Sequence, residues 1–166
     1  MYHGRDRHGM ECTRHFVATC YVVNDGATLL HEHDRLGMWL PPGGHVDRDE
    51  LPHETAIRET REETGLEPTL IAEAGPYDTG TVESLPRPTA LLLEDIDVHQ
   101  GGRVAHQHID FVYVGRVDSR TVDPAGHDEA DPAAWEWFDA DDLEARADDL
   151  EADVRDLGRR AIEMLG

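Results

Sequence analysis

The stretch from Gly44 to Leu66 constrains this chain more than any other, because it reads GHVDRDELPHETAIRETREETGL. It begins at a glycine pair, which allows a tight backbone turn. Pro52 then suits the first turn of a helix, where its missing N–H costs nothing. From there good helix formers continue to Gly65, which suits a left-handed cap, and Pro68 stops any continuation. The pattern predicts a turn followed by one helix.

The two sides of this predicted helix differ in chemistry. At about 100° per residue, one side collects small and aliphatic side chains, which are Ala56, Ile57, Thr60 and Thr64. The opposite side collects carboxylates at spacings i, i+3 and i+4, which are Glu59, Glu62 and Glu63. Arg58 lies one turn before Glu62, so we expect it to orient that carboxylate.

Three glutamates on one helical face repel one another, and a solvated acidic face is the usual interpretation of such a cluster in an acidic chain. The combination with Arg58, Glu50 and the glycine turn favours another interpretation. Clustered carboxylates become favourable when a hard cation binds them, and Mg²⁺ takes oxygen ligands while keeping waters for substrate phosphates. The stretch therefore predicts a divalent-cation site beside a phosphate chain.

These groups also stand at offsets that define a known motif. The positions concerned are Gly44, Glu50, Arg58, Glu59, Glu62, Glu63 and Gly65. With these offsets the stretch resembles the Nudix box, and the chain resembles a Nudix hydrolase, a family that cleaves nucleoside diphosphates linked to some other moiety. Thr60 departs from the family pattern, which usually has an aliphatic residue there, but its methyl group still suits the buried side. The preceding segment 37–44 resembles the family's usual approach to the box.

The resemblance implies a role for each polar group of the box. The implied metal ligands are Glu59, Glu63, Glu62 and the carbonyl of Gly43. Glu62 is alternatively the general base, a role that stays open because family members recruit different bases, some outside the box. Glu50 and Arg58 are the implied supporting pair, in which Arg58 holds the carboxylates in place. The implied cofactor is Mg²⁺ or Mn²⁺.

A second group of candidate residues lies far from the box. On a strand, His106, His108 and Asp110 share one face, so they are candidates to line the substrate cleft. A solvated strand face is the more frequent outcome for such a pattern. Glu129 is a further candidate, because some family members place an additional carboxylate in the corresponding acidic loop. His15 lies outside any motif and is expected to have no chemical role.

The remaining sequence predicts a mixed α/β order of elements. Strands are expected at residues 15–23, 27–32, 69–73, 90–98, 105–117 and 134–138. Two more helices are expected near residues 141–147 and 151–165. This order fits the α/β/α sandwich with a mixed, largely antiparallel sheet that the Nudix resemblance implies. The length of 166 residues suits a single Nudix hydrolase domain over residues 1–166, with residues 1–13 as a flexible N-terminal arm.

The net charge and the hydropathy of the chain limit the classes of molecule that it is expected to bind. The chain has 36 acidic residues, 15 arginines and no lysine, for a formal net charge of −21, which argues against a nucleic-acid polymer as partner. No apolar stretch reaches the roughly 18 residues of a membrane helix, and no apolar signal region begins the chain, so no membrane partner and a cytoplasmic location are expected. We expect a small phosphorylated nucleotide-like substrate, with bound Mg²⁺ or Mn²⁺ reversing the local charge. A homodimer is compatible with the resemblance.

Three functions fit the resemblance. The leading one is a nucleotide pyrophosphatase, a metal-dependent hydrolase that cleaves a diphosphate linkage. A binding or regulatory module without hydrolysis is the alternative, against which the intact acidic set argues. An enzyme like isopentenyl diphosphate isomerase is third, because Cys12 and Cys20 match no motif of that enzyme. The substrate stays open among oxidised nucleoside triphosphates, ADP-ribose, nucleotide sugars and dinucleoside polyphosphates.

A lysine-free acidic surface resembles that of proteins from halophiles, in which salt screens the repulsion between like charges. We therefore expect the melting temperature of this protein to rise steeply between low salt and molar KCl. Thermal unfolding at a series of KCl concentrations measures the effect. A melting temperature that stays constant across the series would contradict the expectation.

Overall fold

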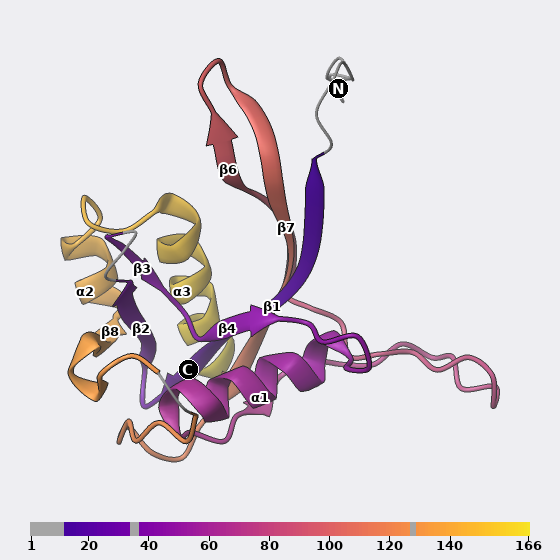
Figure 1. Ribbon diagram of the computed structural model, residues 1–166. Coiled ribbons are helices and arrows are strands. Elements are labelled where there is room, and N and C mark those ends of the chain that lie inside the picture. Colours follow the sequence, from indigo (N-terminus) through magenta and orange to yellow (C-terminus); the bar gives the residue numbers. More distant parts are fainter. Residues whose placement is uncertain (1–11, 34–36, 127–128) are drawn as a thin grey trace.

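The computed structural model describes residues 12–33, 37–126 and 129–166, and within these residues eight strands form one sheet that three α-helices cover (Figure 1). The strands are β1 (Thr13–Asn24), β2 (Ala27–His33), β3 (Met38–Leu40), β4 (Gly43–His45), β5 (Thr69–Leu70), β6 (Ala90–His99), β7 (Arg103–Arg116) and β8 (Trp135–Asp139). The helices are α1 (Pro52–Thr64), α2 (Ala140–Ala145) and α3 (Ala152–Leu165). Among the described helices, none is long and apolar enough to span a bilayer.

A parallel pair of long strands, β1 and β7, forms the centre of the sheet. The register of this pair places His15 beside His108 and Val17 beside Asp110. The other pairings are antiparallel: β2 and β4 join β1, β3 and β8 join β2, and β5 and β6 join β7. The structure thereby confirms the mixed, largely antiparallel sheet that the sequence analysis expected.

Helices cover both faces of this sheet (Figure 1). On one face α1 contributes Ala56 to a buried cluster that includes Ala18, Cys20 and Tyr113 from β1 and β7. The other face carries a second buried cluster, to which α2, α3 and the neighbouring strands contribute Leu143, Val154, Ala161, Tyr21, Val112 and Phe138. The arrangement is the α/β/α sandwich predicted from the sequence.

The box helix begins and ends where the sequence predicted. Pro52 is its first residue, and Leu51 before it is capped through its N–H, which donates to the Glu54 carboxylate at 2.9 Å. At the other end Gly65 has a left-handed backbone with φ of 72°, and its N–H donates to the Arg61 carbonyl at 2.8 Å. Glycine adopts this conformation with little strain, which explains the sharp stop of the helix.

The two glycines at the start of the box differ from the prediction of a tight turn. Gly43 and Gly44 lie in β4 rather than in a loop, and neither has a positive φ. A Cβ on Gly43 would lie 2.6 Å from Thr19 Cγ2, and a Cβ on Gly44 would lie 2.5 Å from the carboxyl carbon of Glu59. At Gly43 glycine is required because β4 approaches the backbone of β1 closely, and at Gly44 a side chain would displace the Glu59 carboxylate; in neither case does the backbone turn demand it.

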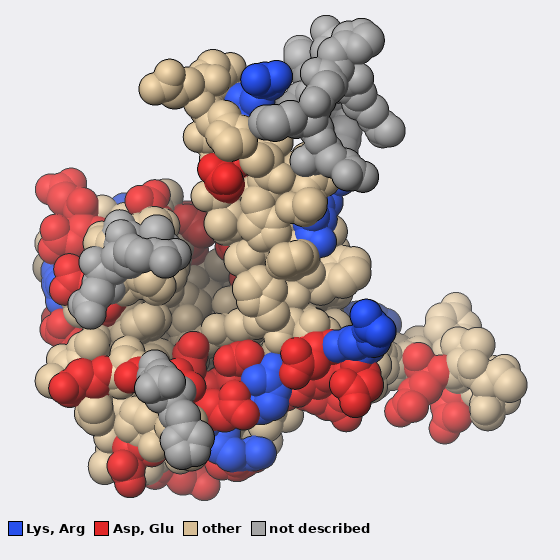
Figure 2. Space-filling model, in the orientation of Figure 1, with Lys and Arg blue, Asp and Glu red and all other residues tan. Residues whose placement is uncertain are grey.

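Strands β6 and β7 project from the sheet as a hairpin beside the start of β1 (Figure 1). Exposed apolar side chains on these strands are Phe16, Leu91, Leu93, Ile96 and Val98. On the face that Figure 2 shows, acidic side chains spread over the body of the molecule, whereas few charged side chains lie on the projecting hairpin. The expected flexible arm at residues 1–13 falls mainly on residues 1–11, outside the described residues, and Thr13 already pairs with His106. The single domain over residues 1–166 stays a prediction.

The end of the box helix provides a test of these packing constraints. A Cβ at Gly65 would collide with the carbonyl of Asp123, whereas Gly80, with φ of 81°, has nothing within 4 Å. We expect Gly80→Ala to lower the free energy of unfolding by about 1 kcal/mol through left-handed strain alone. Gly65→Ala adds the collision and should lower it by roughly 3 kcal/mol, or about 6–12 °C in melting temperature. Equal losses in the two variants would contradict this account of Gly65.

Candidate functional site

Arg58, in the middle of α1, joins the charged groups of the box into one network. Its Nε and Nη2 donate to the two carboxylate oxygens of Glu50, both at 2.8 Å. Its Nη1 donates to Glu59 at 2.8 Å and to Glu62 at 3.0 Å, and Nη2 also donates to the carbonyl of His45 at 3.2 Å. These bonds match the five N–H groups of a guanidinium, so the side chain has a single preferred position.

The network sets the charge of its members. The hydrogen bond from Arg58 holds the pKa of Glu50 below its usual value, so Glu50 stays ionised, and Thr55 adds a bond of 2.7 Å. Hydrogen bonds to Glu50 and then to Glu59 raise the pKa of Arg58. Burial raises the pKa of Glu59, although Arg58 opposes that shift. The structure brings these groups together as the sequence analysis expected, while their roles in catalysis stay predictions.

Glu63 is the most buried carboxylate of the box. Burial raises its pKa to about 8; the Gly43 N–H, at 3.2 Å from Oε2, opposes the shift, and nearby Glu59, Glu129 and Glu62 add to it. Among the described residues, the ion pairs of this site run from Arg58 to other glutamates and none reaches Glu63. A buried carboxylate in this position is stabilised when a cation binds beside it.

The loop after β7 brings one more carboxylate to the site. Backbone N–H groups of Asp123 and Gly126 donate to the carbonyls of Thr64 and Glu62, at 2.9 Å and 2.8 Å. These bonds fasten the loop to the end of α1, where the last helical carbonyls need partners. Glu129 follows this loop, and its charge raises the pKa of both buried glutamates of the box. The structure therefore places Glu129 with the box, although its predicted substrate-binding role is untested.

Strand β4 separates these carboxylates from a cluster of histidines. Side chains alternate along a strand, so Gly44 faces Glu59 and the ring of His45 points to the other side of the sheet. There the His45 ring centroid lies 5.2 Å from that of His15 and 5.1 Å from that of His108. Sequence reasoning gave no role to His15 or His45, because only the strand pairing shows that they meet.

The predicted polar face of β7 is present but lies away from the glutamates. His106, His108 and Asp110 point to the same side, where His106 Nδ1 lies 2.8 Å from Thr13 Oγ1 and Thr19 Oγ1 donates to Asp110 at 2.9 Å. Burial raises the pKa of Asp110 to about 7, and the nearby charge of Glu94 adds to the shift, while Thr19 opposes it. Among the described residues, Asp110 Oδ1 has no hydrogen-bond partner.

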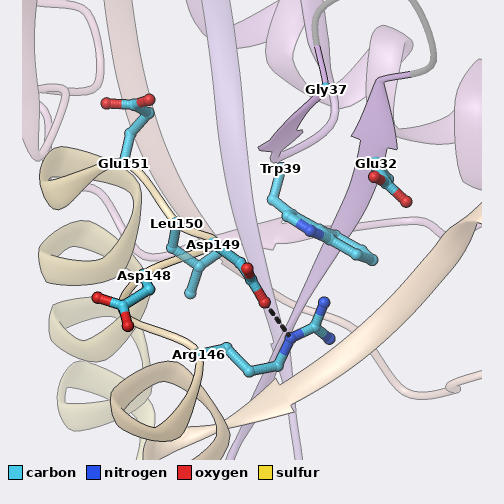
Figure 3. A pocket seen from close by; sticks show the side chains of 8 residues that line it. All are labelled: Glu32, Gly37, Trp39, Arg146, Asp148, Asp149, Leu150 and Glu151. Carbon is cyan, nitrogen blue, oxygen red and sulfur yellow. Dashed lines mark ion pairs between the residues drawn. The ribbon is translucent and has the colours of Figure 1, made fainter.

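A pocket of about 420 Å³ lies elsewhere, between β3 and the turn that joins α2 to α3 (Figure 3). The guanidinium of Arg146 lies 4.7 Å from the Trp39 ring centroid and pairs with Asp149 at 3.6 Å. The other charged side chains lining it are Glu32, Asp148 and Glu151. We place the candidate site at the box rather than in this pocket, because the box holds the hydrogen-bonded carboxylates around Arg58 and the buried carboxylate of Glu63.

Several known proteins are similar to this chain in sequence or fold. The profile of the NUDIX domain family matches residues 13–160. The chain is 59% identical over 39 residues to mouse bis(5'-nucleosyl)-tetraphosphatase (asymmetrical), a match that covers 24% of this chain and only 26% of the mouse protein. It is 32% identical over 135 residues to RNA pyrophosphohydrolase from Gluconacetobacter diazotrophicus, covering 74% of this chain and 72% of that protein. A NUDIX-family hydrolase from Clostridium perfringens has a similar crystal structure, with 30% identity and a TM-score of 0.78, covering 93% and 99% of the two chains.

The buried carboxyl of Asp110 predicts a pH-dependent stability. Its folded pKa of about 7 lies above the unfolded value of 3.8, so the folded protein holds this proton more tightly and its contribution to stability is lost as pH rises from about 4 to 7. We expect Asp110→Asn to raise the free energy of unfolding by roughly 2–4 kcal/mol relative to wild type at pH 8, and to have little effect near pH 4.

Denaturant unfolding at both pH values measures this difference. The exposed Asp97, on the neighbouring strand β6, provides the matched control. Asp97→Asn should change the free energy of unfolding by no more than about 0.5 kcal/mol at either pH. A gain from Asp110→Asn that is the same at pH 4 and pH 8 would show that its charge is not responsible.

Proposed function

The chain belongs to the NUDIX domain family, and we propose that it uses the carboxylates of α1 and a divalent cation to hydrolyse a diphosphate linkage in a nucleoside diphosphate-X type of substrate. One observation carries this proposal: the side chain of Arg58 gathers Glu50, Glu59 and Glu62, and Glu59 and Glu62 lie near the buried carboxylate of Glu63. A cluster of this charge is costly to fold unless it serves to bind cations.

The donor set suits a hard cation. Glu59, Glu62 and Glu63 offer carboxylate oxygens, which Mg²⁺ and Mn²⁺ prefer over nitrogen or sulfur. Burial also raises the pKa of Glu63 to about 8, a shift that a bound cation would reverse.

We assign the steps of hydrolysis to residues of α1. Glu59 and Glu63 would hold the cation, which when bound would polarise phosphate oxygens and lower the pKa of a water. Glu62, with its side chain 43% exposed, is more accessible to that water than Glu59, at 16%. Glu62 would accept the proton as the water oxygen bonds to phosphorus and the phosphorus–oxygen bond of the leaving group breaks. Arg58 binds Glu62 through one oxygen and thereby positions the carboxylate for this proton transfer.

The substrate class follows from chemistry shared by the relatives. The names of the mouse and Gluconacetobacter proteins both describe hydrolysis within a phosphate chain. We extend that shared reaction to this chain, and we propose a small nucleotide as its substrate, because a formal charge of −21 repels a long polyanion. The cytoplasm, where such nucleotides are made, is the proposed location.

The burial of Cys20, the cysteine next to the box helix, argues against the isomerase alternative. Cys20 is fully buried beneath α1, and burial raises the pKa of its thiol to about 12. A thiol with that pKa is neither an acid nor a nucleophile at neutral pH. The module without hydrolysis is disfavoured by the complete set of carboxylates around Arg58.

The role of Glu62 gives a direct test. Glu62→Gln keeps the shape of the side chain and removes its charge, so kcat should fall about 100-fold or more if it is the general base. Glu67→Gln is the matched control, because Glu67 lies just beyond α1 and pairs with exposed Arg61 at 2.6 Å. We expect the control to turn over as wild type does.

Release of phosphate-bearing products provides the measurement. The panel contains a dinucleoside tetraphosphate, ADP-ribose, a nucleotide sugar, an oxidised nucleoside triphosphate and a 5'-triphosphate RNA, each with Mg²⁺ or Mn²⁺ at low and high salt. Near-normal turnover by Glu62→Gln would show that Glu62 is not the general base and that another residue has this role. Turnover that survives removal of divalent cations would overturn the metal-dependent mechanism, and a strong preference for RNA would overturn the small-substrate proposal.

A further inference from the structure

A second cluster of side chains suited to a metal lies across β4 from the glutamates. His15 of β1, His45 of β4 and His108 of β7 each offer a ring nitrogen, and these three atoms lie within 4.8 Å of one another. The three strands come together only in the folded sheet, since residues 15 and 108 are far apart in the chain.

We propose that His15, His45 and His108 form a binding site for a transition-metal cation of the Zn²⁺ class, separate from the carboxylate site. Neutral imidazole suits Zn²⁺, Cu²⁺, Ni²⁺ and Co²⁺, whereas Mg²⁺ and Mn²⁺ prefer carboxylate oxygens. With zinc–nitrogen bonds of about 2.1 Å, the nitrogens of a tetrahedral site lie roughly 3.4 Å apart. The three ring nitrogens already lie within 4.8 Å of one another, so small side-chain rotations would bring them to that spacing.

The sheet preorganises the three ligands. The parallel register of β1 and β7 places His15 directly beside His108. The antiparallel register of β4 places His45 beside Val17, which lies on the same face as His15 and two residues along β1. Because each histidine sits on a strand rather than a loop, little backbone entropy is lost when a cation binds.

The surroundings also suit a cation that prefers neutral nitrogen. The ring of His108 is partly buried beside those of His15 and His45, and an imidazole without a proton offers a ring lone pair to a cation. The ring of His106 closes one side, with centroids 4.6 Å from His15 and 5.1 Å from His108. His15 and His45 are exposed, which leaves room for water as a fourth ligand.

The two cation sites meet at His45. Its ring belongs to the histidine cluster, while its backbone carbonyl accepts a hydrogen bond from Arg58 at 3.2 Å. One residue of β4 therefore contacts both the network that holds the glutamates and the proposed nitrogen site. The two sites differ in the chemistry of their ligands, so each can be filled and measured separately.

Calorimetric titration of the full chain with Zn²⁺, in excess Mg²⁺ to occupy the carboxylates, tests the proposal. The variant His15→Gln/His108→Gln removes two ligands, and the control His33→Gln/His99→Gln removes two imidazoles from elsewhere in the sheet. Wild type and control should bind Zn²⁺ with equal affinity. The affinity of the ligand variant for Zn²⁺ should be lower by about 100-fold or more. Co²⁺ should give a visible absorption band with wild type and control but not with the ligand variant.

A box variant separates this site from the proposed catalytic one. Glu59→Gln/Glu63→Gln removes two carboxylates of α1 and should leave Zn²⁺ affinity unchanged. Zn²⁺ affinity that is lost in the box variant and kept in the histidine variant would overturn the proposal. A crystal of the wild-type protein soaked in Zn²⁺ gives an answer even where a variant fails to fold: anomalous density among the three rings is expected, and density only at the glutamates would also overturn it.

Discussion

The hydrogen bonds of one guanidinium hold together groups that would otherwise repel one another. Arg58 donates to Glu50 before the helix, to Glu59 and Glu62 within it, and to the carbonyl of His45 in β4. It therefore ties a loop, a helix and a strand to a single point. Without it, carboxylates at i, i+3 and i+4 on one helical face would destabilise α1. Arg58 thereby fixes the box against β4, while Ala56 packs the helix on β1 and β7.

The sheet accepts such a helix because the buried side of α1 is made of small groups. Thr60 and Thr64 are fully buried, and their hydroxyl groups donate to the carbonyls of Ala56 and Thr60, at 2.7 Å and 2.5 Å. These bonds satisfy polar atoms that would otherwise be costly in the core. The threonine that departs from the family pattern is thus accommodated without a buried unpaired hydroxyl. The same close packing explains why β4 carries glycine where it faces Glu59.

Local patterns predicted much of this structure, and pairing between distant segments supplied the rest. The box helix, its glycine cap and the long strands follow from periodicity and turn residues, which act over a few positions. Strands β3 and β4 were missed because three residues are too short to show a period. The need for Gly44 was attributed to a turn, since its collision with Glu59 depends on tertiary packing. The meeting of His15 with His108 depends on a parallel register that no local signal contains.

The projecting β6–β7 hairpin has a consequence for how this protein behaves in concentrated solution. It carries Leu91, Leu93 and Ile96 on its surface, while most of the molecule's formal charge of −21 lies elsewhere. In dilute buffer, long-range repulsion keeps the hairpins of neighbouring molecules apart. At 1 M salt the Debye length shrinks to about 3 Å, and that colloidal barrier disappears. Ionic strength therefore has two opposing effects on this protein. It weakens the repulsion between like charges within each molecule, and it also favours association between the exposed apolar hairpins of different molecules.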